Sequence, residues 1–441
     1  MRFYVPEDHQ IERGYLVGLE IRGSRPILSV EDSLEELGLL ADTAGIEVIG
    51  QTTQRLNRVH PSTFIGPGKV EEIKAEIEAH NIQVVIFDDE LSPRHQRELE
   101  KAFGEKVKVL DRSALILDIF AQHAATREGR LQVELAQYEY RLPRLTRQWT
   151  HLARQAGGGG GRGGHGGVGL RGPGETQLEA DRREISNIIS RLKDELEQVR
   201  AHRQRQRQQR EKTSMPVVAL VGYTNAGKST LMRTITNADV YVADQLFATL
   251  DTTTRRITLP SGREVLLSDT VGFIQKLPTT LIAAFRATLE GITEADMLLH
   301  IVDASHPNVW QQVETVEDTL AQIDVPNIPR ILVRNKCDLP IRGPLTPPPE
   351  FNPSEYDAIV DISAKTGQGI PELLELISES LKKNMVKMTV NVPYQNGDVI
   401  SFLHNRAIID EETHTGSGVI ATVRVMPRDV EWLTRFALPS S

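Results

Sequence analysis

The sequence is poor in the features that mark secreted and membrane proteins. It has one cysteine, Cys337, in 441 residues, and a single thiol excludes an intramolecular disulfide. It contains no run of 18 apolar residues, so no membrane-spanning helix is expected. The residues that follow Met1 lack the apolar core of a signal peptide. These absences favour a cytoplasmic protein without a membrane partner.

The chain as a whole also has no net positive charge. Its formal net charge is −9, which by itself argues against a nucleic-acid partner. Residues 127–212, however, hold 18 Lys and Arg against 11 Asp and Glu, a local charge of +7 that leaves −16 for the rest. A basic middle between acidic flanks suggests a face that binds a polyanion. A solvated charged helix explains the same charge equally well.

Strand-like and helix-like stretches alternate in the first quarter of the chain. The expected strands are Leu16–Ile21, Ile46–Ile49, Gln83–Phe87 and Val107–Leu110, and helical patterns lie between them. Such alternation favours a mostly parallel sheet covered by helices. We therefore predict an N-terminal α/β domain over residues 1–112.

Residues 113–213 are predicted to form a long antiparallel helical hairpin. Its two helical stretches are separated by a glycine-rich loop, residues 157–174, in which 12 of 18 residues are glycine. Such a loop cannot bury a core. The second helix carries an apolar stripe of period 3.5–3.6, formed by Leu178, Ile185, Ile188, Ile189, Leu192, Leu196 and Val199.

The rest of the chain is predicted to form two further domains. Residues 214–384 return to strand–helix alternation and are expected to form a P-loop GTPase domain with a parallel-rich sheet. Alternating apolar residues near 386–392 and 419–425 indicate strands of a small α+β domain over residues 385–441. The fold class is therefore α/β.

The strongest motif is a phosphate-binding loop. A buried-strand pattern ending at Val221 leads into Gly222-Tyr223-Thr224-Asn225-Ala226-Gly227-Lys228-Ser229-Thr230 and then a helix. This matches GxxxxGK(S/T) in its required strand–loop–helix context. The loop N–H groups and the helix N-terminus suit phosphate oxygens. Lys228 is expected to reach the β- and γ-phosphates, and the Ser229 hydroxyl to bind Mg²⁺.

Three later motifs follow predicted strands and indicate guanine. Asp269-Thr270-Val271-Gly272 is a DxxG motif, in which Asp269 would hold Mg²⁺ through water and the Gly272 N–H would sense the γ-phosphate. Asn335-Lys336-Cys337-Asp338 is an NKxD motif, and a buried Asp338 carboxylate could accept both guanine N–H donors. The backbone of Ser363-Ala364-Lys365 could meet guanine O6. Ligands bind at the carboxyl ends of strands in such sheets.

These residues resemble the translation-factor-related class of small GTPases. The resemblance implies that Thr249 is the switch threonine that coordinates Mg²⁺ and the γ-phosphate, with Thr252 and Thr253 as alternatives. The expected catalytic residues are Lys228, Thr249, Asp269 and Gly272, and the expected Mg²⁺ ligands are Ser229, Thr249 and Asp269. Residues expected to contact GTP or GDP are those of 222–230, Phe247, Ala248, Thr249, those of 269–272, Asn335, Lys336, Asp338, Ser363, Ala364 and Lys365.

The site lacks one usual catalytic residue. Position 273, where many GTPases place a water-orienting glutamine, is Phe273. The sequence therefore predicts slow hydrolysis by the chain alone and a missing element from elsewhere. Asn225 resembles the asparagine that ligates K⁺ in potassium-activated GTPases, although it could also only brace the loop. A partner acting in trans is the other source.

Most of the chain resembles the HflX family of GTPases. The matching segments outside the GTPase motifs are Thr63–Lys69, Asp111–Phe120, Leu131–Gln137 with Leu142–Leu145, and Gly172–Glu179 with Asp181–Arg183. The sequence departs from the family at His123, in the length of the glycine-rich loop, and at Thr252 or Thr253, where a proline is common.

The resemblance implies a GTPase that binds the large ribosomal subunit and its rRNA and acts in ribosome splitting, rescue or recycling. A GTP-dependent, non-enzymatic switch for RNA or protein is the alternative. We expect a monomer when free. Arginines that could contact RNA phosphates are Arg141, Arg144, Arg147, Arg154, Arg162 and Arg171. Gly66–Lys69 before a helix could bind a second phosphate, but a helix-capping turn explains it more simply.

Overall fold

The computed structural model describes residues 12–24, 26–104, 106–145, 177–211, 215–236, 246–247, 252–277, 291–293, 295–323, 325, 328–343, 347–349 and 351–438. These residues form two compact units, each described here by itself. Unit 1 takes its residues from Met1–Arg203, Asp244–Asp251 and Gln275–Ala287, and unit 2 takes the others. Among the described residues no helix is long and apolar enough to cross a membrane.

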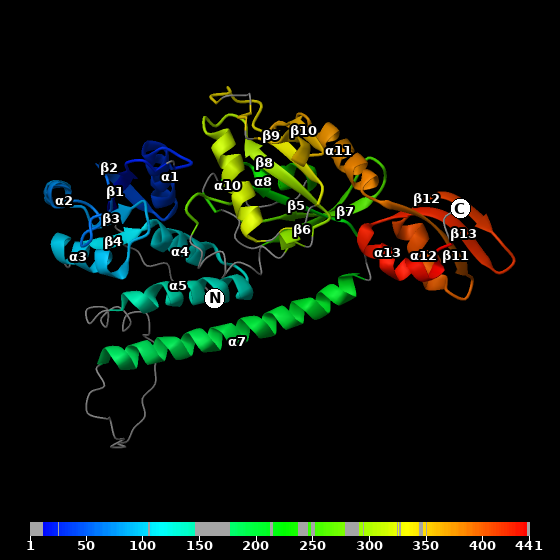
Figure 1. Ribbon diagram of the computed structural model, residues 1–441, viewed down its shortest axis with the longest axis horizontal. Coiled ribbons are helices and arrows are strands. Elements are labelled where there is room, and N and C mark those ends of the chain that lie inside the picture. Colours follow the sequence, from blue (N-terminus) through cyan, green and yellow to red (C-terminus); the bar gives the residue numbers. More distant parts are fainter. Residues whose placement is uncertain are drawn as a thin grey trace, which may run out of the picture. The chain divides into compact units, whose positions relative to one another are not determined.

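Unit 1 contains a four-stranded parallel sheet with strand order β2-β1-β3-β4. Its strands are β1 (Glu12–Ile21), β2 (Ile46–Leu56), β3 (Val84–Phe87) and β4 (Lys108–Asp111), linked by α1 (Val30–Thr43), α2 (Pro67–His80) and α3 (Pro93–Phe103). All four residues of β3 are buried, as expected for an inner strand covered on both faces. The predicted parallel α/β fold of this region is confirmed (Figure 1).

The segment Thr63–Lys69 forms a tight turn that caps α2. Phe64 takes a left-handed backbone conformation (φ 65°) and packs edge-on against Phe87 at 6.0 Å. Gly66 is the N-cap and Pro67 the first helical residue, the position proline favours. Lys69 Nζ donates to Thr52 Oγ1 at 2.9 Å and pairs with Glu72 at 2.8 Å. Because protein groups already hold this ammonium, the geometry favours the capping turn over a second phosphate site.

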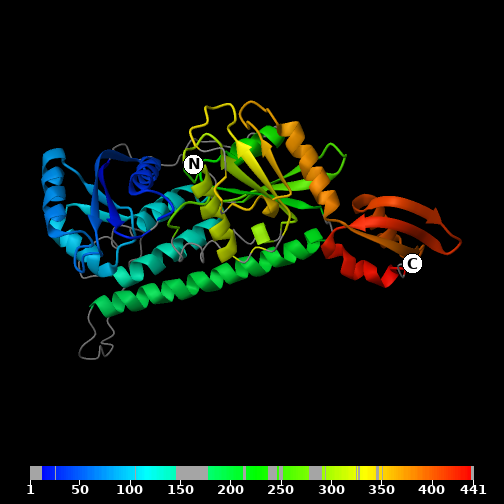
Figure 2. The ribbon, with the colours of Figure 1, turned by 45° about the horizontal axis from the view of Figure 1, so that its top comes forward.

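Three helices follow the sheet of unit 1. They are α4 (Arg112–His123), α5 (Arg127–Arg141) and α7 (Gln177–Glu211), with a short 3-10 turn, η1 (Leu142–Arg144), after α5. Helices α5 and α7 lie side by side in both views (Figures 1 and 2). Their contact is apolar and contains Leu131, Leu135, Ile189, Leu192 and Leu196, so the predicted stripe of the second helix does face a partner helix. The glycine-rich loop lies outside the described residues.

Arg144 has a structural role in unit 1. It is 8% exposed, its Nη2 donates to Leu91 O at 2.7 Å, and its guanidinium lies 3.6 Å from the centre of the Tyr140 ring. The prediction that Arg144 contacts RNA is wrong for this conformation, because a buried, paired arginine cannot reach a phosphate. Arg147, Arg154, Arg162 and Arg171 lie outside the described residues.

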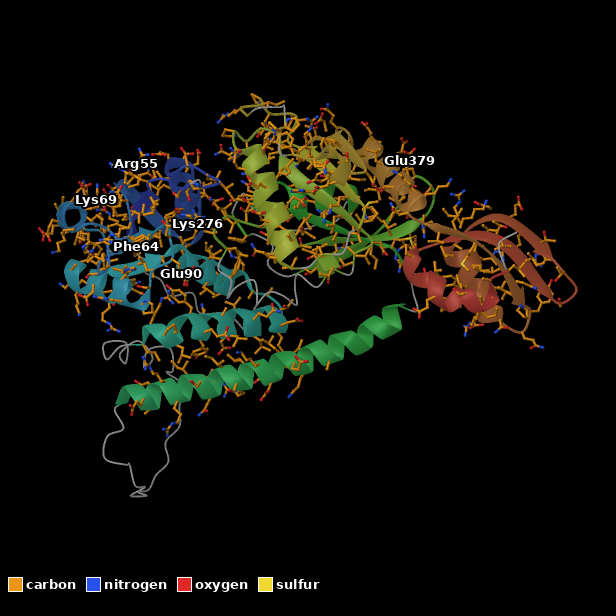
Figure 3. All side chains as sticks on the ribbon, viewed as in Figure 1. Arg55, Phe64, Lys69, Glu90, Lys276 and Glu379 are labelled. Carbon is orange, nitrogen blue, oxygen red and sulfur yellow. The ribbon has the colours of Figure 1, made fainter. Side chains whose placement is uncertain are left out.

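A buried ion network organises the carboxyl edge of the unit 1 sheet. Arg112, 1% exposed, pairs at 2.7 Å with both Asp88 and Glu36. Burial alone would lower the pKa of Arg112, but these two carboxylates more than offset it and hold the pKa above its ordinary value. Lys276, labelled in Figure 3, adds a second cation that pairs with Asp88 and Asp89. Arg112 therefore has a structural role in neutralising buried carboxylates.

Unit 2 contains a six-stranded sheet with order β10-β9-β8-β5-β7-β6. The strands are β5 (Val217–Gly222), β6 (Thr253–Thr258), β7 (Glu264–Asp269), β8 (Met297–Asp303), β9 (Arg330–Asn335) and β10 (Ala358–Asp361). Only β6 runs antiparallel to its neighbour, so the sheet is mixed but parallel-rich, as predicted. Its helices include α8 (Lys228–Thr236), α10 (Val309–Gln322) and α11 (Ile370–Lys383), and a 3-10 turn, η3 (Pro353–Glu355), precedes β10.

The end of unit 2 is a small α+β module. Its antiparallel sheet has order β11-β13-β12, formed by β11 (Val386–Pro393), β12 (Ile408–His414) and β13 (Gly418–Val425). Helices α12 (Gly397–Arg406) and α13 (Pro427–Leu433) and the turn η4 (Thr434–Phe436) accompany it. Alternate residues of β11 and β13 form the core with Val399, Leu403 and Leu433. The predicted α+β character is confirmed.

Replacing Arg112 with Met should lower the free energy of unfolding by about 3–5 kcal/mol, because it leaves Asp88 and Glu36 without their shared cation in a buried place. Urea denaturation of the full chain measures the loss. Arg55→Met is the matched control, because Arg55 pairs with Glu20 on the surface and should contribute less than about 1 kcal/mol. Equal, small effects of both substitutions would contradict the assigned role of Arg112.

Candidate functional site

The predicted motifs of unit 2 gather at one edge of its sheet. Strand β5 ends at Gly222, β7 at Asp269, β9 at Asn335 and β10 at Asp361, and these four strands run parallel (Figure 1). Their carboxyl ends therefore share the edge at which ligands bind in open α/β sheets. The motifs, each of which follows a strand in the sequence, are therefore grouped at one edge of the sheet.

The loop between β5 and α8 has glycine where a side chain cannot fit. A Cβ on Gly222 would lie 2.2 Å from Ile301 O, and a Cβ on Gly227 would lie 2.2 Å from Asn335 Nδ2. Gly227 also has a left-handed backbone (φ 97°), and exposed Asn225 shares that region (φ 59°). Left-handed conformations cost little for glycine and are tolerated by asparagine. The loop therefore places glycine and asparagine at the two positions whose left-handed backbone other residues rarely adopt.

Lys228, the first residue of α8, lies buried against this loop. Its Nζ donates to Tyr223 O at 2.7 Å and to Gly222 O at 3.0 Å. Burial lowers the pKa of Lys228 to about 8, and the nearby Asp269 offsets only part of that shift. A buried ammonium held mainly by carbonyl oxygens is under-compensated, so an anion placed beside it would be strongly favoured.

The DxxG segment approaches the loop from β7. Ser229 Oγ donates to Asp269 Oδ2 at 2.8 Å, and Thr270 Oγ1 donates to Leu220 O at 2.6 Å. A Cβ on Gly272 would lie 2.9 Å from Thr224 Cα and 3.1 Å from Lys228 Nζ. Glycine at 272 therefore lets two loops and one ammonium converge. Val271 is buried beside it, and Thr230 is half-buried on α8.

Phe273 has a role that its sequence position does not reveal. Its side chain is 2% exposed, and its backbone forms a parallel bridge with Tyr223. Phe273 N donates to Gly222 O at 3.1 Å, and Phe273 O accepts from Thr224 N at 2.8 Å. The residue that replaces the usual glutamine thus joins the DxxG segment to the phosphate loop through the backbone and the core.

The NKxD and SAK segments are joined by one amide. Asn335 Nδ2 donates to Ala226 O at 2.8 Å, and Asn335 Oδ1 accepts from Ala364 N at 2.9 Å. Ser363 Oγ donates to Asp338 Oδ1 at 2.6 Å, and this bond is the main reason that the pKa of Asp338 lies below its ordinary value. Lys336 has a left-handed backbone (φ 64°) and pairs with Asp303 at 2.8 Å.

Two details differ from expectation on this side of the site. Asp338 is exposed, not buried, although its carboxylate is held in the ionised form and in a fixed direction. Thr234 of α8, which no motif marks, donates from its hydroxyl to Ala364 O at 2.6 Å. The sequence gives no signal for that contact, since it joins residues 130 positions apart. Lys365 lies exposed at the end of the segment.

The predicted switch segment is described only in part. Ala248 and Thr249 lie outside the described residues. Phe247 belongs to unit 1, where it is 3% exposed, has a left-handed backbone (φ 58°) and packs edge-on on Phe120 of α4 at 4.6 Å. Thr253, an alternative switch threonine, begins β6 and pairs in register with Asp269.

Together these elements define a class of protein. A strand, a glycine-shaped loop, a buried lysine at a helix start and a serine–aspartate pair beside it are the arrangement of a P-loop nucleotide-binding domain. Four family models cover most of the chain: "GTP-binding GTPase N-terminal" (residues 31–121), "GTP-binding GTPase Middle Region" (123–210), "50S ribosome-binding GTPase" (217–336) and "HflX C-terminal domain" (352–436).

Within that class, the chain belongs to the HflX family of GTPases. It is 45% identical to "GTPase HflX" of Caldanaerobacter subterraneus over 92% of this chain and 91% of that protein. It is 44% identical to "GTPase HflX" of Escherichia coli K12 over 91% of each. A solved structure described as a complex of SsGBP and GDP aligns with 84% of this chain and 99% of its own, at 21% identity and a TM-score of 0.47. The family identified from the sequence is confirmed.

Replacing Lys228 with Met should raise the free energy of unfolding of the nucleotide-free chain at pH 7, by about 3 kcal/mol at most. The folded pKa of about 8 lies below the ordinary 10.5, so the charged form is the one that folding disfavours. Between pH 8 and 10.5 the unfolded chain binds more protons, and the native chain gains stability as pH rises. The advantage of the variant should therefore shrink across that window.

Chemical denaturation at pH 7 and pH 10 measures this difference. Lys365→Met is the control, because it removes an exposed lysine of the same site and should leave the stability nearly unchanged at both pH values. A Lys228→Met variant that is less stable than the parent at pH 7 would show that the ammonium is already compensated by the protein.

Proposed function

We propose that this HflX-family GTPase binds the large ribosomal subunit and couples GTP hydrolysis to splitting, rescue or recycling of ribosomes. The observation that carries the proposal is Phe273, which is buried and paired with Tyr223 at the position where a water-orienting group is needed. Phosphate- and base-binding elements beside an incomplete catalytic set favour a group supplied from outside the chain. The match of residues 217–336 to the model described as "50S ribosome-binding GTPase" supports the ribosome as that activator.

The phosphate side of the site fits a nucleoside triphosphate. The carbonyl-held, under-compensated Lys228 would contact the β- and γ-phosphates, and the Gly222–Gly227 backbone would follow the phosphate chain. The absence of a Cβ at Gly272 leaves its N–H within reach of the γ-phosphate side of the loop, since a Cβ there would crowd Lys228 Nζ. Each of these features favours a bound polyphosphate.

The same residues fit a magnesium ion. Ser229 and Asp269, whose Oγ and Oδ2 atoms are 2.8 Å apart, would hold it together with Thr249. The described residues contain no cluster of three or more His, Cys, Asp or Glu that could hold a metal alone. Mg²⁺ suits such a site because it keeps waters and phosphate oxygens in its shell. When bound, it would neutralise charge that develops on the phosphate oxygens. Lys228 would add to that neutralisation from the protein.

The base side of the site fits guanine. The hydroxyl of Ser363 holds one oxygen of Asp338 and favours its ionised form, so the carboxylate is a fixed acceptor for the two N–H donors of guanine. Asn335 ties this side to the phosphate loop at Ala226. The distance between the base and phosphate subsites is thereby set by one side chain.

Two sources could complete the catalytic set. One is K⁺ beside Asn225, whose exposed side chain lies at a left-handed turn of the phosphate loop. The other is the ribosome. The basic residues of 127–212 offer an electrostatic surface for rRNA. We propose that this region works as the helical hairpin of a four-part chain, divided at residues 112, 213 and 384, with the glycine-rich loop as its RNA-directed tip.

GTP turnover should rise at least about ten-fold when isolated large subunits are added to the full chain, since a supplied group that stabilises the transition state contributes factors of this size or greater. The measurement is phosphate release at saturating GTP. Small subunits serve as the control. Turnover that large subunits leave unchanged, while co-sedimentation depends on GTP, would instead favour the non-enzymatic switch.

The same assay separates the two sources of the missing element. If K⁺ completes the site, replacing KCl with NaCl should slow turnover with and without subunits by the same factor. If the ribosome alone completes it, the change of salt should have little effect. Deleting residues 157–172 should leave turnover without subunits intact and reduce the response to them.

Replacing Asp338 with Asn should weaken GDP binding by at least about 100-fold, because the asparagine NH2 would face the 2-amino group of guanine and only a neutral oxygen would remain to accept from N1–H. The asparagine amide can donate to the O2 of xanthine, so XDP should become the better ligand. Titration calorimetry with both nucleotides measures the exchange of preference. Unaltered preference for GDP would remove Asp338 from the base subsite.

A further inference from the structure

The peptide group between Ala364 and Lys365 in the SAK segment accepts a hydrogen bond that none of the sequence motifs predicts. The carbonyl of Ala364 accepts a hydrogen bond of 2.6 Å from Thr234 Oγ1. The N–H of Ala364 is taken separately, by Asn335 Oδ1 at 2.9 Å. Both backbone polar groups of Ala364 are therefore used within unit 2, and its N–H already has an acceptor in the protein. Ala364 itself is 2% exposed.

The next N–H along the chain remains available. Within the described residues the turn uses the N–H of Ser363 with Gln368 O, of Thr366 with Ser363 Oγ, and of Gly367 with Ser363 O. The N–H of Lys365 forms no hydrogen bond to any residue that the structure describes. Lys365 is exposed, so this donor can meet a ligand.

The planarity of the peptide links these two observations. The carbonyl of Ala364 and the N–H of Lys365 belong to one trans peptide, in which C=O and N–H point in opposite directions. A hydroxyl that fixes the carbonyl on the α8 side therefore fixes the N–H on the other side. Hydrogen bonding to the carbonyl also polarises the peptide and strengthens its N–H as a donor.

We propose that Thr234 is a positioning residue for guanine recognition, and that the donor it orients, Lys365 N–H, contacts guanine O6. The inference rests on the proposed guanine-nucleotide site and names a specificity element within it. Adenine carries an amino group at the corresponding position, and a fixed N–H donor would face another donor. The segment would then reject adenine through its backbone, independently of the Asp338 carboxylate.

The place of Thr234 in the fold suits this role. Helix α8 begins with Lys228 and Ser229 at the phosphate side and reaches the base side at Thr234, less than two turns later. Thr234 Oγ1 also lies 3.0 Å from Thr230 O, within its own helix, but the bond to Ala364 O is shorter. The β-branched side chain has few rotamers, so the hydroxyl is held firmly. One short helix thus sets both subsites.

Three variants of the full chain isolate the hydroxyl. Thr234→Val removes the donor and keeps the shape, and Thr234→Ser keeps the donor. Thr236→Val is the matched control, because Thr236 Oγ1 donates only to Met232 O within the same helix, at 2.8 Å. Each is tested for binding of GDP and of 6-thio-GDP, in which sulfur replaces O6 and accepts hydrogen bonds weakly while N1–H and the 2-amino group remain.

Thr234→Val should weaken GDP binding about five-fold, the factor that corresponds to one ordinary hydrogen bond. It should weaken 6-thio-GDP binding less than two-fold, because the O6 contact is already impaired in that ligand. Thr234→Ser and Thr236→Val should stay within two-fold of the parent for both nucleotides. Turnover of GTP at saturation should be unchanged in Thr236→Val, the control outside the base subsite.

Each other result identifies what has failed. If Thr234→Val weakens GDP and 6-thio-GDP equally, Thr234 only supports the fold, and the inference is overturned. The inference also fails if GDP binding does not change, provided that the parent binds GDP and Lys228→Ala does not. A parent that binds GDP no better than ADP would overturn the proposed guanine site itself.

Discussion

The site depends on the amide of Asn335. Its two ends join three segments that are far apart in sequence, since Nδ2 donates to Ala226 O and Oδ1 accepts from Ala364 N. The contact is possible only because Gly227 has no Cβ, which would lie 2.2 Å from Nδ2. A side-chain amide suits this place because it donates from its nitrogen and accepts at its oxygen at once. Aspartate could not replace it, because a carboxylate oxygen would then face the carbonyl oxygen of Ala226 and no hydrogen bond could form.

A second constraint comes from Phe273, which occupies the position where many GTPases place a water-orienting glutamine. The same residue that prevents a polar group from orienting water also ties the DxxG segment to Gly222 and Thr224 through the backbone. A polar residue there would have to leave the core or remain buried without a partner, and either outcome would loosen the phosphate loop. The buried phenylalanine thus stabilises the loop.

The sequence predicts the binding elements well because their spacing expresses backbone geometry. Glycines at 222, 227 and 272 stand where a Cβ would collide. The phosphate-loop motif anticipates the first two, and the DxxG motif anticipates the third. The same holds for the sheets, since strand–helix alternation leaves few topologies. These features depend on residues that are near one another in the chain or follow a known order.

Features that depend on tertiary partners could not be predicted in this way. From the sequence, Arg144 is predicted to lie on the surface, and only the structure reveals its contacts with Leu91 and Tyr140. Asp338 is predicted to be a buried carboxylate, yet in the structure it is exposed and is oriented by Ser363. The sequence marks Thr234 only as a helix residue, because its partner Ala364 is 130 positions away in the chain. In each case the chemistry of the side chain was evident, but its neighbour was not.

Two of the buried cations among the described residues, Arg112 and Lys228, show how such neighbours decide between structural and binding roles. Arg112 has carboxylates at 2.7 Å on two sides, and they hold its pKa above the ordinary value in spite of burial. Lys228 is held by backbone carbonyls, and burial lowers its pKa to about 8. A cation neutralised by the fold has little further affinity for an anion, whereas an under-compensated one retains it. The sequence motif marks Lys228, but the electrostatic balance is the physical reason that this lysine, and not Arg112, suits a phosphate.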